Sequence, residues 1–107
     1  MLLDRNQEPG GVGKYALINM RRYRALPPDK AKEAHDLLGK LEALGIVDTG
    51  ARGADDEFFV IKLKDRSAAA ALFAYANDAA NFDLEWANQV AALATRAEHH
   101  PAKKQPD

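Results

Sequence analysis

The chain has 107 residues, of which 47% are hydrophobic; 15 are Lys or Arg and 16 are Asp or Glu, giving a formal net charge of −1. This length suits one domain with a modest core, and a charge near zero gives no general attraction to nucleic acid or to an anionic membrane. The sequence contains no cysteine, which excludes disulfides, thiolate metal sites and thiol chemistry. It also lacks an apolar run long enough for a signal peptide or a bilayer span, so we expect a cytoplasmic protein without membrane association.

The first part of the chain predicts an arm, a strand and a helix. Residues 1–13 are polar and rich in glycine, which is typical of a flexible arm. Residues 14–20 (KYALINM) combine β-branched and aromatic side chains and predict a strand, and residues 21–28 form a connection. Residues 28–45 predict a helix, because small and apolar side chains recur at steps of three and four: Ala31, Ala34, Leu37, Leu38, Leu41 and Leu44.

The second part predicts a hairpin followed by two helices. Residues 46–65 indicate a short strand, a loop and a longer strand, although residues 46–49 leave open whether the sheet has three strands or two. Residues 65–81 predict an alanine-rich helix capped by Asp65 or Ser67. A last helix begins after Asp83 and runs to residue 98, with an inner side made of Trp86, Val90, Leu93, Ala94 and Ala97.

Together these elements predict an α+β fold in the order β-α-β-β-α-α, similar to a split β-α-β arrangement. A small sheet of three strands would pack against three helices within a single domain at residues 14–98, and residues 99–107 would form a disordered tail. Such a sheet has two open edges, which favours pairing between copies and therefore a homodimer.

The segment Gly10-Gly11-Val12-Gly13-Lys14 nearly matches a phosphate-binding P-loop. The motif requires an opening glycine where this chain has Glu8, and a Ser or Thr where it has Tyr15. A carboxylate at Glu8 would repel phosphate, and the segment precedes a predicted strand instead of a helix. We therefore interpret it as a hinge before the first strand, and we expect no nucleotide cofactor.

Residues 46–51 (IVDTGA) resemble the catalytic turn of the aspartic proteases. The resemblance implies that Asp48 is an acid–base residue, paired with the same residue from a second copy so that the two carboxylates share a proton. It covers six residues, and that family is nearly all β, whereas more than half of this chain is predicted to be helical. A dimeric hydrolase is therefore our third hypothesis.

The predicted sheet would have an outer face on which apolar and basic side chains meet. Alternation along the strands places Tyr15, Leu17, Phe58 and Val60 on this face. Large apolar residues on an outer face are typical of a protein interface. Basic residues lie near one end of the same face: Arg21, Lys62 and Lys64. Arg22 and Arg24 also follow the first strand. Aromatic groups beside such positive charge can bind single-stranded nucleic acid.

The leading hypothesis is therefore a small, non-enzymatic interaction module that self-associates through its sheet and binds a protein partner through Tyr15, Leu17, Phe58 and Val60. The alternative is a nucleic-acid-binding protein that uses the five basic residues. We expect neither a cofactor nor a metal, because the three histidines, His35, His99 and His100, have no accompanying set of ligands in the sequence.

Overall fold

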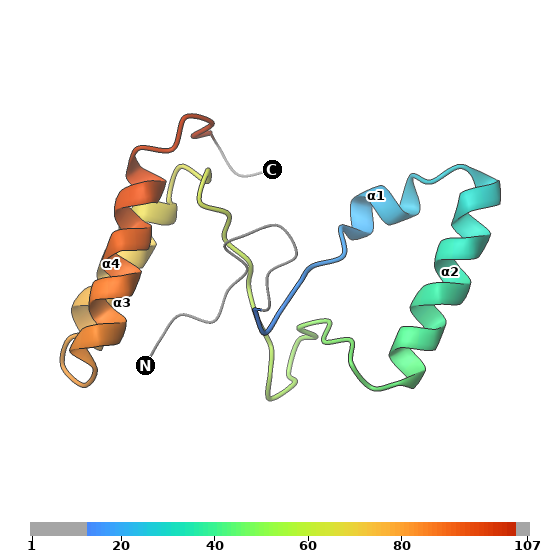
Figure 1. Ribbon diagram of the computed structural model, residues 1–107, viewed down its shortest axis with the longest axis horizontal. Coiled ribbons are helices and arrows are strands. Elements are labelled where there is room, and N and C mark those ends of the chain that lie inside the picture. The colour runs from blue at the N-terminus through green and yellow to red at the C-terminus, as the bar shows by residue number, and fades with distance from the viewer. Residues whose placement is uncertain (1–12, 105–107) are drawn as a thin grey trace. The chain divides into compact units, whose positions relative to one another are not determined.

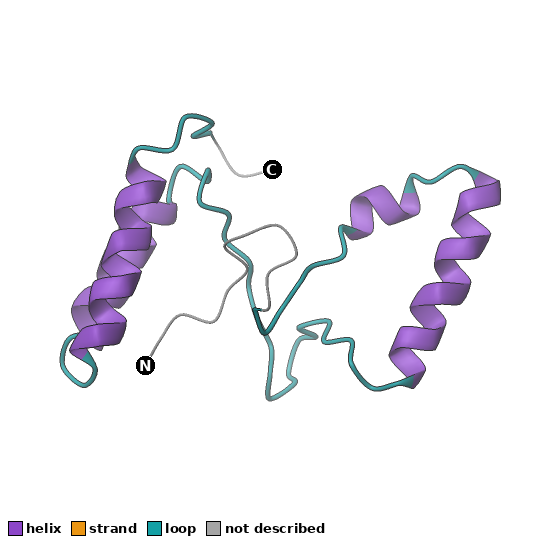
Figure 2. Cartoon of the chain, in the orientation of Figure 1, coloured by secondary structure: helices purple, strands orange, loops and turns teal. Residues whose placement is uncertain are grey.

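The computed structural model describes residues 13–104, and in this range the chain is helical (Figure 1). Four helices account for 52% of the described residues: α1 (Met20–Arg24), α2 (Pro28–Ala43), α3 (Ala68–Ala79) and α4 (Leu84–Glu98). No strand is present among the described residues, as the colouring by secondary structure in Figure 2 shows.

The predicted α+β fold, with its sheet and its β-α-β-β-α-α order, is therefore wrong. Residues 15–19 and 57–62 lie in irregular backbone, and Met20 already belongs to α1. The physical reason is that β propensity favours an extended backbone, while a strand also needs a neighbour to which its backbone groups can bond. No backbone hydrogen bond joins 15–19 to 57–62 in the described part of the chain.

The chain divides into two compact units. One consists of residues 15–59 and contains α1 and α2; the other contains α3 and α4, and its described residues are 13–14 and 60–104. The predicted domain limits at residues 13 and 98 stay predictions, as does the disorder of residues 99–107. The P-loop-like residues 10–12, most of the predicted arm and residues 105–107 lie outside the described residues.

In the 15–59 unit, local signals explain both helices. The Asn19 side chain accepts a hydrogen bond from the Arg22 N–H (3.0 Å) and caps α1. Helix α2 confirms the helix predicted over 28–45: it begins at Pro28, with Asp29 in its first turn, and ends before Gly45, whose N–H donates to the Glu42 carbonyl. The structure buries no residue of this unit.

Helices α3 and α4 form a hairpin with a core built largely of alanine. Its buried residues come from both helices, and all but one of them are alanines: Ala68, Ala69, Ala76, Ala79, Ala87, Val90, Ala94 and Ala97. Leu63, Leu72 and Phe73 pack against one end of this core. Small side chains on both helices allow their backbones to approach closely. The predicted inner side of the last helix is confirmed for Val90, Ala94 and Ala97, whereas Trp86 and Leu93 are only half-buried.

The two ends of the hairpin are fixed by capping and by backbone pairing. Asp83 caps α4 as predicted, accepting the Trp86 N–H at 3.0 Å. Before α3, the Asp65 carboxylate accepts the Ser67 N–H at 2.8 Å, while Ser67 stands at the N-cap position without a side-chain bond. At this same end of the hairpin, the Lys104 N–H donates to the Lys64 carbonyl at 2.8 Å.

Candidate functional site

The four residues predicted to bind a partner are all exposed, but no sheet face unites them. Tyr15, Leu17 and Phe58 belong to the 15–59 unit, whereas Val60 belongs to the other unit. The alternation that placed them on one face depended on strands that the described chain does not form. Their role in binding stays a prediction. It now concerns individual exposed side chains and no longer a common sheet face.

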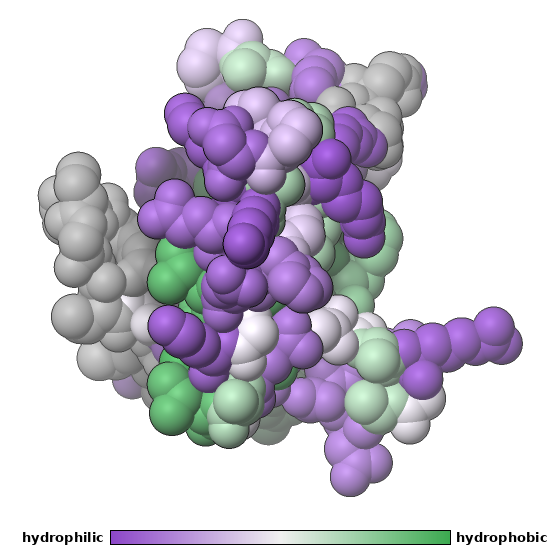
Figure 3. Space-filling model, turned by 90° about the vertical axis from the view of Figure 1, so that its right-hand side faces the viewer, coloured by the Kyte–Doolittle hydropathy of each residue, from purple (hydrophilic) through white to green (hydrophobic). Residues whose placement is uncertain are grey.

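A second apolar surface lies on α2 and its C-cap residue Leu44, within the apolar stripe predicted for residues 28–45. Ala31, Ala34 and Leu38 are half-buried, whereas Leu37, Leu41 and Leu44 are 54%, 38% and 72% exposed. At 100° per residue the three exposed leucines fall within one arc of about 60°, beside the half-buried residues. We call these three residues the leucine seam. Figure 3, turned so that the right-hand side of Figure 1 faces the viewer, shows hydrophobic side chains gathered at the lower left of a mainly hydrophilic surface.

The leucine seam was missed because periodicity identifies an apolar face without showing what covers it. The structure supplies the missing information. The apolar arc of α2 is wide, and the only helix in its unit that can cover it, α1, has five residues. A helix of that length is about 7.5 Å long and cannot cover a 16-residue stripe.

The five predicted basic residues are divided between the two units. Arg21, Arg22 and Arg24 lie on α1 and are exposed, while Lys62 and Lys64 belong to the other unit. In the part of the chain that the structure describes, none of these side chains forms an ion pair. Of the five basic residues, only the three arginines therefore lie together on one element.

Tyr23 fixes the direction in which these arginines point. It is the half-buried residue of α1, and its hydroxyl forms a hydrogen bond with Nδ1 of His35 on α2 (3.3 Å). Successive helical residues are rotated by 100°, so Arg21 lies nearly opposite Tyr23, and Arg22 and Arg24 lie on its two sides. Arg21 thus lies on the side of α1 opposite the Tyr23–His35 contact, and Arg22 and Arg24 flank that contact.

The loop that carries the aspartic-protease-like turn is irregular and open to solvent. Asp48 is exposed, and its carboxylate makes no hydrogen bond within the described residues. Gly50 has φ +66°, and the Phe58 ring packs over it. An acid–base dyad needs a second carboxylate close by and shielded from water. A catalytic role for Asp48 stays a prediction that depends on such a partner.

The α3–α4 hairpin carries an aromatic pair and a carboxylate with a shifted pKa. Trp86 Nε1–H donates to the Tyr75 hydroxyl at 3.2 Å, linking α4 to α3. The hydrogen bond from the Trp86 backbone N–H lowers the pKa of Asp83 below its ordinary value, because it favours the ionised carboxylate. Both features are explained by holding the two helices together.

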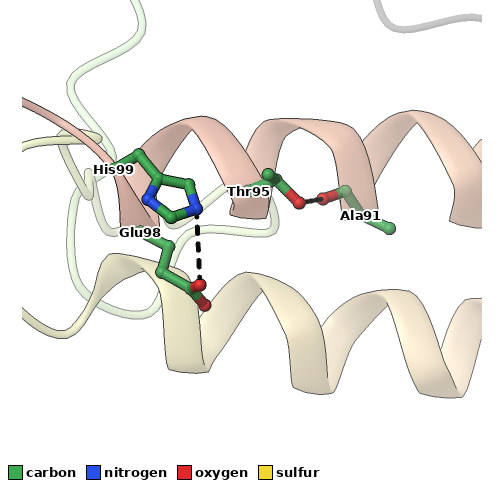
Figure 4. A network of polar contacts seen from close by, with 4 residues as sticks. All are labelled: Ala91, Thr95, Glu98 and His99. Carbon is green, nitrogen blue, oxygen red and sulfur yellow. Dashed lines mark hydrogen bonds and ion pairs between the residues drawn. The ribbon is translucent and has the colours of Figure 1, made fainter.

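Polar contacts near the end of α4 give no metal centre or acid–base site. Thr95 Oγ1 donates to the Ala91 carbonyl at 3.1 Å, and His99 Nε2 lies 3.6 Å from a Glu98 oxygen (Figure 4). The hydroxyl bond lies within one helix, and the His99–Glu98 pair is exposed. Nowhere in residues 13–104 do three or more metal-binding side chains of His, Cys, Asp or Glu come together.

Two further observations limit the interpretation. In the described range, none of the helices has both the length and the apolar character needed to cross a bilayer. Comparisons with models of protein families, with curated proteins and with solved structures found no match to this chain.

Proposed function

We propose that this chain is a protein-interaction module in which the 15–59 unit provides the binding surface. The observation that carries the proposal is the leucine seam: three leucines in one arc of α2 remain exposed in a unit with no buried residue. Exposed apolar patches on small proteins are typical of protein interfaces. A partner that binds the leucine seam would remove its apolar surface from water. This burial would contribute about 25 cal/mol of binding free energy per Å² of apolar area.

The proposal is tested by site-specific photo-cross-linking. A benzophenone amino acid replaces Leu41 in one variant and Lys32 in a control, since Lys32 lies on the opposite side of α2 and is also exposed. The cells that express each variant are irradiated. A cross-linked product with one other protein is expected from position 41 only. Leu37→Asp in the same chain should remove that adduct while far-UV circular dichroism stays unchanged. Equal adducts from both positions, or none from position 41, would contradict the proposal.

A second candidate function is nucleic-acid binding, supported by the exposed arginines of α1. Three guanidinium groups on one short helix, without ion-pair partners in the described chain, can contact phosphates. We expect any such binding to a labelled single-stranded oligonucleotide to weaken steeply between two salt concentrations. Loss of binding in Arg21→Ala/Arg22→Ala, with binding kept in Lys30→Ala/Lys32→Ala, would favour this candidate over non-specific attraction.

A further inference from the structure

Charge is separated along the 15–59 unit. Residues 15–32 contain five basic side chains and one acidic side chain, whereas residues 33–59 contain two basic and seven acidic side chains. Two short segments within these halves combine charge with exposed apolar groups. The whole chain is nearly neutral, so there is little net repulsion between copies.

The basic segment is residues 17–24. It begins with apolar side chains, of which Leu17 is 66% exposed and Ile18 and Met20 are also exposed. It continues into the exposed arginines of α1, of which Arg21 lies opposite Tyr23 and its contact with His35. In chain order this segment therefore runs from apolar to positive.

The acidic segment is residues 55–59, Asp55-Asp56-Glu57-Phe58-Phe59. All five side chains are exposed, Phe59 to 85%. Glu57 accepts the Gly53 N–H at 2.9 Å, while Asp55 and Asp56 form no ion pair among the described residues. In chain order this segment runs from negative to apolar, the reverse of the basic segment.

We propose that the acidic segment of one copy docks antiparallel on the basic segment of a second copy. In that orientation the carboxylates of 55–57 face the α1 arginines, and Phe58 and Phe59 face Leu17, Ile18 and Met20. Within one copy the two segments do not bond to each other: no hydrogen bond or ion pair joins them in the described chain. A two-fold axis repeats the contact, so each copy provides both segments and the dimer closes.

The apolar residues and the charges have different roles in this contact. Ion pairs between exposed groups contribute about 0–1 kcal/mol each, so affinity depends mainly on burying the phenylalanines and their aliphatic partners. The charges set the direction of docking and exclude the parallel arrangement, in which arginines would face Phe58 and Phe59.

Charge reversal tests the proposal, which rests on the proposed interaction function. One variant carries Arg21→Glu and Arg22→Glu, the other carries Asp55→Lys and Asp56→Lys, and Lys30→Glu/Lys32→Glu is the control with the same charge change as the first. Glu57 is left intact because it bonds to the loop backbone. Molar mass is measured by sedimentation over a concentration series, and circular dichroism checks the helix content of every variant.

The native chain and the control are expected to dimerise, and each reversed variant alone is expected to dimerise at least about tenfold more weakly. In each such homodimer, like charges outnumber opposite charges across both contacts, although Arg24 and Glu57 keep their native charge. An equimolar mixture of the two reversed variants should restore the dimer, because both contacts become complementary again.

A monomeric native chain would overturn the proposal, as would dimers unaffected by either reversal. A further variant carries all four substitutions in one chain. If this variant regains the native behaviour in sedimentation but the mixture does not, the two segments pair within one copy, and the proposal is also overturned. If position 41 still cross-links to a different protein, the proposed function stands and only this mode of self-association fails.

Discussion

The ring of Phe58 lies directly over the backbone of Gly50. A Cβ atom at Gly50 would stand 2.7 Å from Cε1 of that ring, closer than van der Waals contact permits. Gly50 also has φ +66°, a conformation that side-chain-bearing residues adopt only at a cost. The loop between α2 and residue 58 is therefore closed by an aromatic side chain on a glycine, and Gly50 is required for two separate reasons.

Gly50→Ala is expected to destabilise the 15–59 unit by about 2–3 kcal/mol, because it adds backbone strain and displaces the Phe58 ring. Gly53→Ala is the matched control, since Gly53 has φ +83° but open space around its Cβ position. Gly53→Ala should lower the free energy of unfolding only through backbone strain, by about 1 kcal/mol. Urea unfolding followed by circular dichroism measures both, and equal losses would show that the Phe58 contact contributes nothing.

Gly39→Ala is expected to stabilise α2 by about 0.5–1 kcal/mol. Gly39 lies inside this helix, and no atom stands within 4 Å of its Cβ position, so alanine gains helix propensity without a clash. Far-UV circular dichroism and the urea midpoint should both rise. A fall in helicity would contradict this expectation. It would show that a Cβ atom at position 39 disturbs the helix.

Asp83 is expected to make the α3–α4 hairpin sensitive to acid. Its pKa is lowered in the folded chain by the Trp86 N–H, so its contribution is present above the unfolded pKa of about 3.9 and is lost as the pH falls through the lower, folded value. Thermal unfolding measured between neutral pH and acid should show this loss. Asp83→Asn keeps a capping oxygen without titrating and should flatten that pH dependence, while Asp83→Ala should lower stability at neutral pH.

Ala94→Leu is expected to destabilise the hairpin by about 1–3 kcal/mol. Ala94 is completely buried between α3 and α4, where a larger side chain forces the helices apart. Ala92→Leu, on the exposed side of α4, is the control and should change stability by less than about 0.5 kcal/mol, since alanine and leucine both favour helix. Similar effects at both positions would contradict the close packing described for this hairpin.

The sequence predicted the three long helices because their signals are local. Asp83 before an apolar repeat, Pro28 at the start of α2 and Gly45 after its end act within one or two helical turns. The strands failed because pairing depends on a distant neighbour, and residues such as Leu17 and Phe58 carry β propensity whether or not one is present.

Part of the candidate surface could be predicted and part could not. Leu17, Phe58 and the arginines of α1 were identified from their residue types, and all are exposed. The leucine seam belongs to the apolar stripe predicted for residues 28–45, but its exposure was not predicted, because the spacing is the same whether a helix packs against its own chain or remains uncovered. Spacing alone does not distinguish Leu38, which is half-buried, from Leu41, which is more exposed; only the structure does.

The tight connection between α3 and α4 also bears on the order in which the chain folds. The two helices are separated only by residues 80–83, so their contacts join positions close in sequence and little chain entropy is lost in forming them. We expect this hairpin to form rapidly after synthesis. The 15–59 unit has no comparable buried centre, so we expect its ordering to follow that of the hairpin.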